Sequence, residues 1–397
     1  MSGKEDGVQG RPMARVSLVT IAGQWLRLGC IGFGGPPTHI ALLRRLCIQE
    51  RAWIDTKEFE DAIATTNLLP GPASTQLAIY CAWRLRGAAG AVLGGLCFIV
   101  PGLVLILTLS SVFLAGHPPG WVLGAAAGAG AAVPAVALNA ASGLVPASWK
   151  RIGTGRVRQT RWVLYAVLGA AAAATVGAYL VLVLLACGLT EIVVRRRRGR
   201  PISSSSARAV IPAVVLHAAA VSGLGALAWV AFKVGALSYG GGFVIIPLMQ
   251  HDAVATYHWM TGAQFLNAVA LGQVTPGPVV QTVAVVGYAA GGVGGGLLAA
   301  LIAFAPSFVF VLLGGSRFEQ IRGNSAVESF LTGAGPAVTG AIAGSAIPLG
   351  LAFQHLWQIP ILAGALFWFF VLRRGVVSGL LLAGAIGAAL ALAGLPA

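Results

Sequence analysis

Long apolar runs return along the whole chain, and this feature limits its fold more than any other. Examples are residues 88–115, 121–145, 162–194, 291–315 and 376–395. About 20 consecutive apolar residues allow a helix to cross a bilayer. The chain is 57% hydrophobic and 9% charged, whereas soluble domains carry roughly 25% charged residues. We therefore predict an all-α, polytopic membrane protein.

The net charge of +15 comes from basic residues that stand mostly between the apolar runs. They cluster at residues 44–57, 150–161 and 195–200. Because basic loops stay on the cytoplasmic side of a membrane, topology explains the charge and we predict no nucleic-acid partner. The 55 glycines are expected mainly to let helices pack closely in lipid.

The chain contains an internal duplication. The corresponding segments are 27–43 (RLGCIGFGGPPTHIALL) with 233–249 (KVGALSYGGGFVIIPLM), Trp53 with Trp259, 70–72 with 276–278 and, after a slip of one residue, Gly87 with Gly292. The shift is 233 − 27 = 206 residues before the slip and 292 − 87 = 205 after it. Self-similarity of this length predicts two structurally equivalent halves.

Loop charges predict that the two halves lie in opposite orientations. The loop at 150–161 is basic and its counterpart at 351–358 has no Lys or Arg, while Arg317 and Arg322 correspond to the neutral loop at 115–120. Each basic loop thus faces a neutral partner, which indicates inverted-topology repeats. We predict a polar tail at 1–15, a first transmembrane repeat at 16–194, a basic, Ser-rich cytoplasmic linker at 195–208 and a second transmembrane repeat at 209–397.

Inverted repeats need an odd number of crossings in each half. In the first half, helices are expected near 16–40, 87–114, 120–146, 161–175 and 177–194. The predicted architecture is therefore about ten transmembrane helices plus two broken or re-entrant segments.

The broken segments are NLLPGPASTQLA (67–78) and GQVTPGPVVQTV (272–283). Each carries a Pro-Gly-Pro, although proline breaks a helix. Irregular backbone at membrane depth is tolerated where it is buried in protein or lines a cavity, and paired breaks in inverted repeats indicate a substrate site. A half-helix that starts there directs free N–H groups and partial positive charge inward, which suits an anion. The alternative is a packing kink whose hydroxyls bond back to their own helix.

Basic residues at matched positions also favour an anion. Arg27 and Lys233 each precede an aromatic–Gly–Gly turn, and no Asp or Glu lies well inside a predicted span. Ionisable residues in a membrane are candidates for function, although both could instead extend to the interface, and His39 could be a packing histidine. The candidate substrate-binding residues are Arg27, Phe33, Gly34, Gly35, His39, Asn67, Pro70, Gly71, Pro72, Ser74, Thr75, Gln76, Lys233, Tyr239, Gly240, Gly241, Gln273, Thr275, Pro276, Gly277, Pro278 and Gln281.

The segments 33–45, 51–80, 240–249 and 265–288 resemble the chromate ion transporter family in its long, two-domain form. The resemblance covers nearly the whole chain. It implies a secondary transporter that exports chromate across the cytoplasmic membrane, with sulfate as a related oxyanion, and so confers chromate resistance. The driving force would be the membrane potential, the proton gradient or both. The positions that match the family motifs are Phe33, Gly34, Gly35, Pro36, His39, Asn67, Pro70, Gly71, Pro72, Ser74, Thr75, Gly240, Gly241, Gly242, Gln273, Thr275, Pro276, Gly277 and Pro278. Ala73, Gln76 and Asn267 depart from the family pattern.

The alternative function is an importer or channel for sulfate or a related oxyanion. No HExxH, Walker-type or GxSxG motif occurs, so we predict neither an enzyme nor a cofactor. The five cysteines show no CxxC spacing, and no metal site is expected. The expected partners are chromate, sulfate and the lipid bilayer, and a homodimer is left open.

Overall fold

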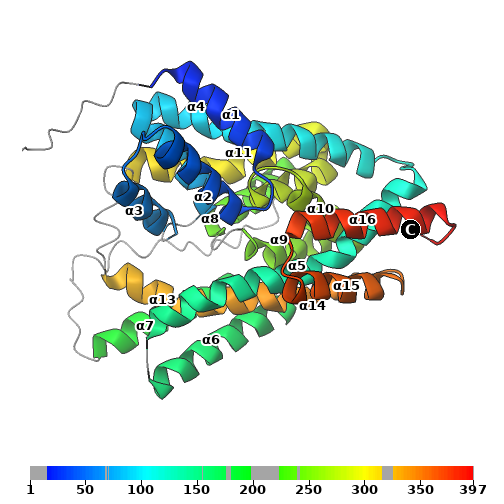
Figure 1. Ribbon diagram of the computed structural model, residues 1–397. Helices are drawn as coiled ribbons and strands as arrows, with labels where there is room; N and C mark the ends of the chain where they lie inside the picture. The colour runs from blue at the N-terminus through cyan, green and yellow to red at the C-terminus, as the bar shows by residue number, and fades with distance from the viewer. Residues whose placement is uncertain are drawn as a thin grey trace, which may run out of the picture.

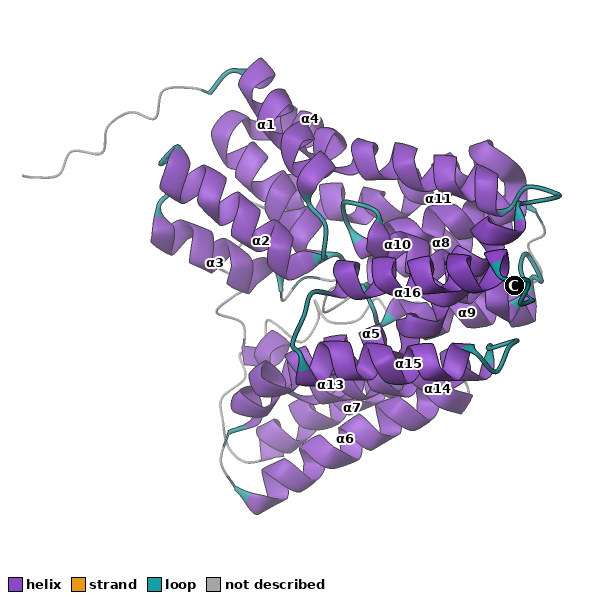
Figure 2. Cartoon of the chain, turned by 45° about the vertical axis from the view of Figure 1, so that its right-hand side comes forward, coloured by secondary structure: helices purple, strands orange, loops and turns teal. Residues whose placement is uncertain are grey.

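The computed structural model describes residues 16–67, 69, 71–153, 155–175, 180–197, 223–238, 242–314 and 325–396. All regular secondary structure in these residues is helical, which confirms that prediction for them (Figures 1 and 2). The first half contains α1 (Leu18–Ile31), α2 (Pro36–Arg44), α3 (Thr56–Thr66), α4 (Ala73–Phe113), α5 (Gly120–Ile152), α6 (Arg156–Thr175) and α7 (Leu180–Arg197). The second half contains α8 (Leu224–Leu237), α9 (Ile245–Gln250), α10 (Gly262–Val274), α11 (Thr282–Gly314), α13 (Ser325–Gly344), α14 (Ala346–Leu351), α15 (Gln358–Leu366) and α16 (Val376–Leu392).

Irregular backbone occurs at the same places in both halves. A π-helical turn, η1 (Arg45–Glu50), follows α2, and its counterpart η4 (His251–Thr256) follows α9. The long helices α4 and α11 are each kinked at a glycine with φ of 61°, Gly87 and Gly292. Kinks have specific local causes, so their recurrence at the shifts found in the sequence shows that the halves share one backbone path.

The equivalent long helices run in opposite directions. Gly95 of α4 packs against the Phe308 ring of α11, whereas Leu107, further along α4, packs against Gly296, which comes earlier in α11. Contacts in this order require the two helices to be antiparallel. The packing therefore has the arrangement expected of inverted repeats.

The two halves also exchange their last helices. Helix α13 packs against α6 and α7 of the first half, while α5 packs against α15 and α16 of the second (Figure 1). Helices α5 and α13 are counterparts, since 120 + 205 = 325. Each half is thus completed by a pair of helices from the other half.

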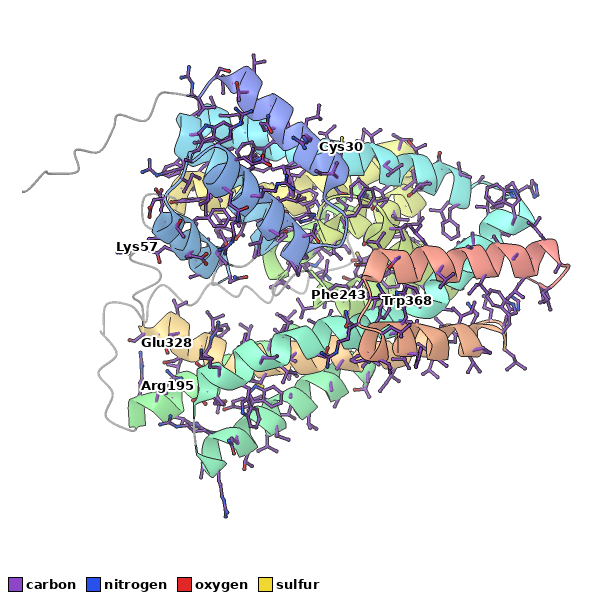
Figure 3. The ribbon with its side chains drawn as sticks, in the orientation of Figure 1. Cys30, Lys57, Arg195, Phe243, Glu328 and Trp368 are labelled. Atoms are coloured by element: carbon purple, nitrogen blue, oxygen red, sulfur yellow. The ribbon has the colours of Figure 1, made fainter. Side chains whose placement is uncertain are left out.

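One end of the molecule collects basic residues. Lys57 and Arg195 lie at this end, and Arg195 Nη1 is 3.6 Å from Glu328 Oε1 in the first turn of α13 (Figure 3). The chain's C-terminus lies at the opposite end (Figure 1). From the positive-inside rule, we expect the basic end to face the cytoplasm. Arg317 and Arg322 lie outside the described residues.

Four helical segments in the described residues are long and apolar enough to cross a membrane. They are α4, α5, Val279–Gly314 and Ser325–Leu351. Shorter apolar helices are α1, α8, Gln358–Val371 and α16. Large aliphatic side chains remain exposed on α11, with Leu301 70% and Leu313 74% accessible, as expected for surfaces that face lipid. The number of transmembrane helices, about ten, stays a prediction.

Two predicted boundaries are wrong. The first helix does not extend over 16–40, because Gly34 and Gly35 adopt φ of 96° and 74° and a new helix starts at Pro36. The helix expected near 177–194 does not end at residue 194, since α7 continues to Arg197. Arg195 is held there by Glu191, one turn earlier, at 3.5 Å. Residues 198–208 lie outside the described residues.

Candidate functional site

Each proline break is bonded to the glycine turn of the other half. The Gly71 N–H donates to the Ser238 carbonyl at 2.7 Å, and the Gly277 N–H donates to the Gly32 carbonyl at 2.9 Å. These two bonds are counterparts, since 71 + 206 = 277 and 32 + 206 = 238. The broken segments therefore meet the opposite half through one reciprocal pair of backbone contacts.

Glycine is required at the centre of both breaks. Gly71 has φ of 117° and Gly277 has φ of 99°, a region that L side chains avoid. The space is also filled: a Cβ at Gly277 would lie 3.1 Å from the Gln281 amide, and one at Gly71 would clash with Gln76. The sequence thus places a side-chain-free residue where the backbone must turn and approach its neighbours.

Proline restarts the helix after each break. Pro72 precedes α4, and Pro278 precedes a short 3₁₀ turn, η5 (Val279–Gln281), that leads into α11. Proline suits this place because an N–H in the first turn has no intrahelical acceptor. The Pro276 carbonyl packs against Gly102 of α4, so the second break lies directly on the long helix that follows the first.

His39 of α2 contacts both the first glycine turn and α4. Its Nε2 lies 2.9 Å from the Gly32 carbonyl and its Nδ1 lies 3.1 Å from the Ser74 hydroxyl. A carbonyl only accepts, so Nε2 carries the hydrogen and Nδ1 accepts from Ser74. The ring is completely buried and meets the edge of Phe98. His39 thereby joins the first glycine turn to the start of α4.

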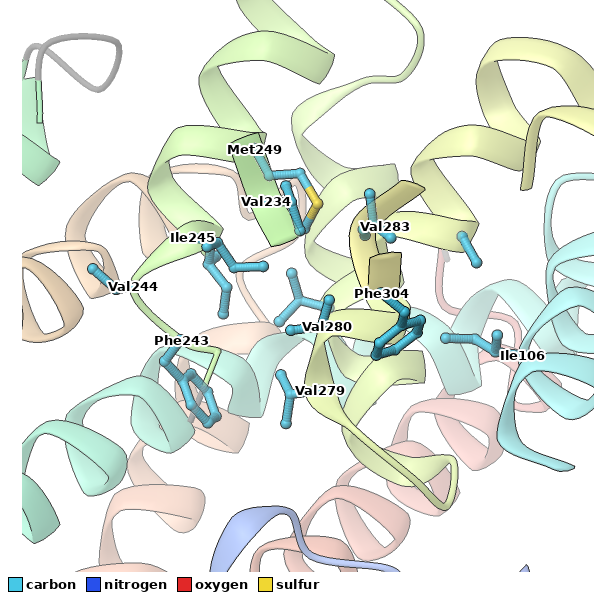
Figure 4. Packing of buried hydrophobic residues seen from close by; sticks show 14 of the residues in the cluster. Ile106, Val234, Phe243, Val244, Ile245, Met249, Val279, Val280, Val283 and Phe304 are labelled. Carbon is cyan, nitrogen blue, oxygen red and sulfur yellow. The ribbon is translucent and has the colours of Figure 1, made fainter. Parts of the chain in front are cut away.

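The second half lacks this polar connection. Ile245 stands at the counterpart of His39, and Val280 at that of Ser74. Val279 and Val280 lie close to Ile245 and Phe304 in a buried apolar cluster (Figure 4). The two breaks share a backbone path but differ in chemistry, and the first is the more polar.

Buried polar atoms without a hydrogen-bond partner gather around the breaks. In the described part of the chain they include the hydroxyls of Thr75, Ser238 and Ser307 and the Gln273 amide nitrogen. All four residues are at least nine-tenths buried. Ser307 would be 3.4 Å from a Cβ at Gly71, and Ser238 supplies the carbonyl that Gly71 bonds. Native proteins pair nearly all buried polar groups, so these donors mark a candidate ligand site.

The structure brings most of the predicted site residues together. Those buried around the breaks or the first glycine turn are Gly35, His39, Gly71, Pro72, Ser74, Thr75, Gln76, Gln273, Thr275, Pro276, Gly277, Pro278 and Gln281. The Thr275 hydroxyl bonds back to Leu271, and the Gln281 amide donates to the Ile99 carbonyl at 2.8 Å. Gly34 and Phe33 lie in the same turn with greater exposure, and Asn67 is exposed at the end of α3. Pro70, Tyr239, Gly240 and Gly241 lie outside the described residues.

The two basic candidates occupy different surroundings. Arg27 lies on the exposed face of α1, whereas Trp25 and Gly29 on the opposite face pack against α4. Lys233 Nζ is 2.6 Å from the Asp252 carboxylate in η4 and 5.8 Å from the centroid of Trp229. Asp252 therefore already offsets the charge of Lys233, and we leave both basic residues out of the proposed site.

Sequence reasoning missed Ser238, Asp252 and Ser307. Ser307 has Gly102 as its counterpart in the first half, since 102 + 205 = 307. No pattern in the sequence shows that Ser238 and Ser307 approach the first break from the other half, or that Asp252 pairs with Lys233.

Replacing Lys233 with methionine should destabilise the fold more than it impairs transport. Asp252, whose side chain is only 9% exposed, would lose its partner. We expect the free energy of unfolding to fall by about 2–3 kcal/mol, less than the roughly 3–5 kcal/mol of a fully buried pair because Lys233 is partly exposed. Thermal unfolding in detergent measures the effect. The Lys233→Met/Asp252→Leu double variant should recover stability and transport, and a stable double variant without transport would show that Lys233 serves the anion instead.

An all-helical membrane protein in which two inverted repeats each contribute an interrupted helix has an architecture found in many membrane transporters. The sequence model described as "Chromate transporter" matches residues 19–221 and 225–392 of this chain. The chain belongs to the chromate transporter family.

Curated relatives match over most of their length. A protein of Pseudomonas aeruginosa named "Chromate transport protein" is 31% identical over 369 residues, which cover 84% of this chain and 86% of the relative. A protein of Cupriavidus metallidurans with the same name is 31% identical over 344 residues, covering 85% and 83%. No solved structure matches the chain.

Proposed function

We propose that this protein is a secondary transporter that exports chromate from the cytoplasm across the inner, cytoplasmic membrane and so confers chromate resistance. Membership of the chromate transporter family and the names of the two relatives support chromate as the substrate. The observation that carries the site is the group of buried donors without described partners around the two breaks.

The chemistry of this cluster suits an oxyanion. The hydroxyls of Thr75, Ser238 and Ser307 surround the first break, and each can donate to an anionic oxygen. The N-terminus of α4 begins in the same place and adds the positive end of a helix dipole. Neutral donors bind a dianion without a fixed positive charge that would hold it permanently, as transport requires.

The membrane potential gives a direction to transport. Moving one elementary charge through 100 mV is worth about 2.3 kcal/mol, so a dianion that leaves an inside-negative cell gains roughly 4.6 kcal/mol. We propose that the anion binds between the breaks while the two repeats rock about it, with their reciprocal backbone contacts as the pivot. Export then needs no acidic side chain to carry protons.

Flux in proteoliposomes tests the function. Purified protein is reconstituted with chromate inside, and a potassium diffusion potential is imposed with valinomycin. We expect efflux to rise with internal negative potential and to respond little to an imposed pH gradient. Absence of chromate flux would refute the function, and flux that follows pH alone would refute the driving force. A parallel sulfate arm separates a chromate exporter from a general oxyanion carrier, and currents that do not saturate would indicate a channel.

Removing the donor hydroxyls should weaken transport without weakening the fold. Thr75→Val and Ser307→Ala each delete a buried hydroxyl that has no described partner. We expect the KM for chromate to rise about tenfold for each, the typical worth of a hydrogen bond to a charged group, with thermal stability unchanged or improved. Ser110→Ala is the matched control, because the buried Ser110 hydroxyl bonds back to Ile106 in α4. An unchanged KM in both variants would contradict the site.

A further inference from the structure

A cavity of about 360 Å³ opens at the end of the molecule opposite the basic end. It lies between the connection of α4 to α5, the first turns of α10 and the connection of α14 to α15. Trp357, in the last of these connections, bonds the carbonyl of Pro396 beside the chain's C-terminus, which Figure 1 marks at this end. The volume of the cavity falls in the range of small-ligand pockets.

Helix α10 joins this cavity to the second break. Thr261 caps the helix inside the cavity, and Gln264 and Asn267 line it from the first two turns. The same helix ends at Val274, directly before Thr275 and Pro276. Its 13 residues span about 20 Å at 1.5 Å per residue, so one short helix leads from the cavity to the proposed binding site.

The polar side chains that line the cavity are Thr261, Gln264, Asn267, Gln354, His355 and Gln358. Among the described residues, no Asp, Glu, Lys or Arg lines it. The Gln264 carbonyl accepts from the Thr261 N–H in a capping box, which leaves its NH₂ group to donate elsewhere. Asn267 is 92% buried, 8% being exposed. Amide donors without carboxylates favour an oxyanion over a cation.

The first half carries ion pairs at the equivalent place. The counterparts of Gln264 and Leu266 are Glu58 and Glu60, since 58 + 206 = 264 and 60 + 206 = 266. Glu58 pairs with Arg84, and Glu60 pairs with Arg44 at 2.6 Å. These ion pairs tie α3 to α4 and α2, and carboxylates there repel an anion.

We propose that the cavity is an outer vestibule that binds the oxyanion as it leaves the second break, and that the structure is an outward-facing state closed at the basic end by the ion pairs of α3. This inference rests on the proposed oxyanion transport. It assigns the vestibule residues Gln264 and Asn267 a role in selecting anions at the external face, separate from the donors at the breaks.

A single carboxylate in the vestibule tests the proposal. Gln264→Glu keeps the capping box, because Glu serves at that position as well as Gln, and adds a negative charge. External chromate is applied to right-side-out vesicles, and its uptake under internal positive potential is measured. We expect the external KM to rise about tenfold from repulsion of a dianion across a few ångströms. Gln49→Glu in η1, exposed at the opposite end, is the control and should leave the external KM unchanged.

The outcomes distinguish a failure of the proposed function from a failure of the vestibule proposal. No chromate uptake by the wild type would refute the proposed function, whereas normal wild-type uptake with an unchanged KM in Gln264→Glu would refute the vestibule alone.

A second experiment measures labelling of Ala263→Cys in a Cys30→Ser/Cys97→Ser background. Ala263 lines the cavity, so an impermeant anionic methanethiosulfonate should label it from outside intact cells faster than a cationic one. Equal rates, or labelling only in inside-out vesicles, would also overturn the proposal.

Discussion

Replacing Gly71 or Gly277 with alanine should abolish transport while the protein remains in the membrane. Both glycines have positive φ, both lack room for a Cβ, and both donate the backbone bond that joins one half to the other. Alanine would strain the backbone at positive φ and press on the Gln76 or Gln281 side chain, so the break would shift from its position. Where groups must be held in position, a displacement of about 1 Å costs roughly a hundredfold in rate.

Chromate flux in proteoliposomes, normalised to reconstituted protein, measures this effect. Gly143→Ala is the first control, since Gly143 lies inside α5 with open space around it, and alanine in a helix is favourable. Gly292→Ala is the second, because Gly292 has φ of 61° but no neighbour within 4 Å of a Cβ. This second control separates the effect of backbone strain at positive φ from the effect of losing the contact between a break and the other half. Wild-type flux in Gly71→Ala and Gly277→Ala would show that the breaks tolerate movement and do not hold the anion.

The second large effect is expected at His39. His39→Leu removes both the donor to Gly32 and the acceptor for Ser74, although it fits an apolar space like that around Ile245 in the other half. We expect flux to fall by about fiftyfold, because the carbonyl that receives the Gly277 N–H loses its second donor and the start of α4 loses its anchor.

His39→Gln supplies the graded comparison. The amide nitrogen of the introduced glutamine can still donate toward the Gly32 carbonyl, while the contact with Ser74 is altered. Flux through His39→Gln should therefore lie between the fluxes of the wild type and His39→Leu. Ser74→Ala should resemble His39→Gln, because it removes the same hydrogen bond from the other side. Equal and full activity in all three variants would mean that His39 only fills space.

Local chemistry made much of the fold predictable. Apolar length identifies membrane helices, and proline or glycine marks their interruptions, because each effect depends on a few neighbouring residues. The paired breaks and the glycines at 71 and 277 follow from such signals. The end of α1 at Ile31 was missed because the apolar run continues past the glycine turn, so hydropathy alone does not register it.

The composition of the site could be predicted only in part. Ser74, Thr75 and Gln273 stand beside the breaks in sequence, and proximity along the chain was enough to find them. Ser238 and Ser307 approach the first break from the opposite half, and no periodicity encodes a contact between segments so far apart. Lys233 illustrates the same limit, since its position suggests an anion and the sequence does not show that Asp252, 19 residues away, is its partner.

The exchange of terminal helices has a consequence for biogenesis. When a ribosome has inserted α5, the helices that will cover it, α15 and α16, are still untranslated. The insertion machinery, lipid or a chaperone must therefore shield the glycine-lined surface of α5 until synthesis is nearly complete. The two halves therefore depend on each other for folding. A gene truncated at the midpoint yields a polypeptide whose helices lack the surfaces against which they pack in the full chain.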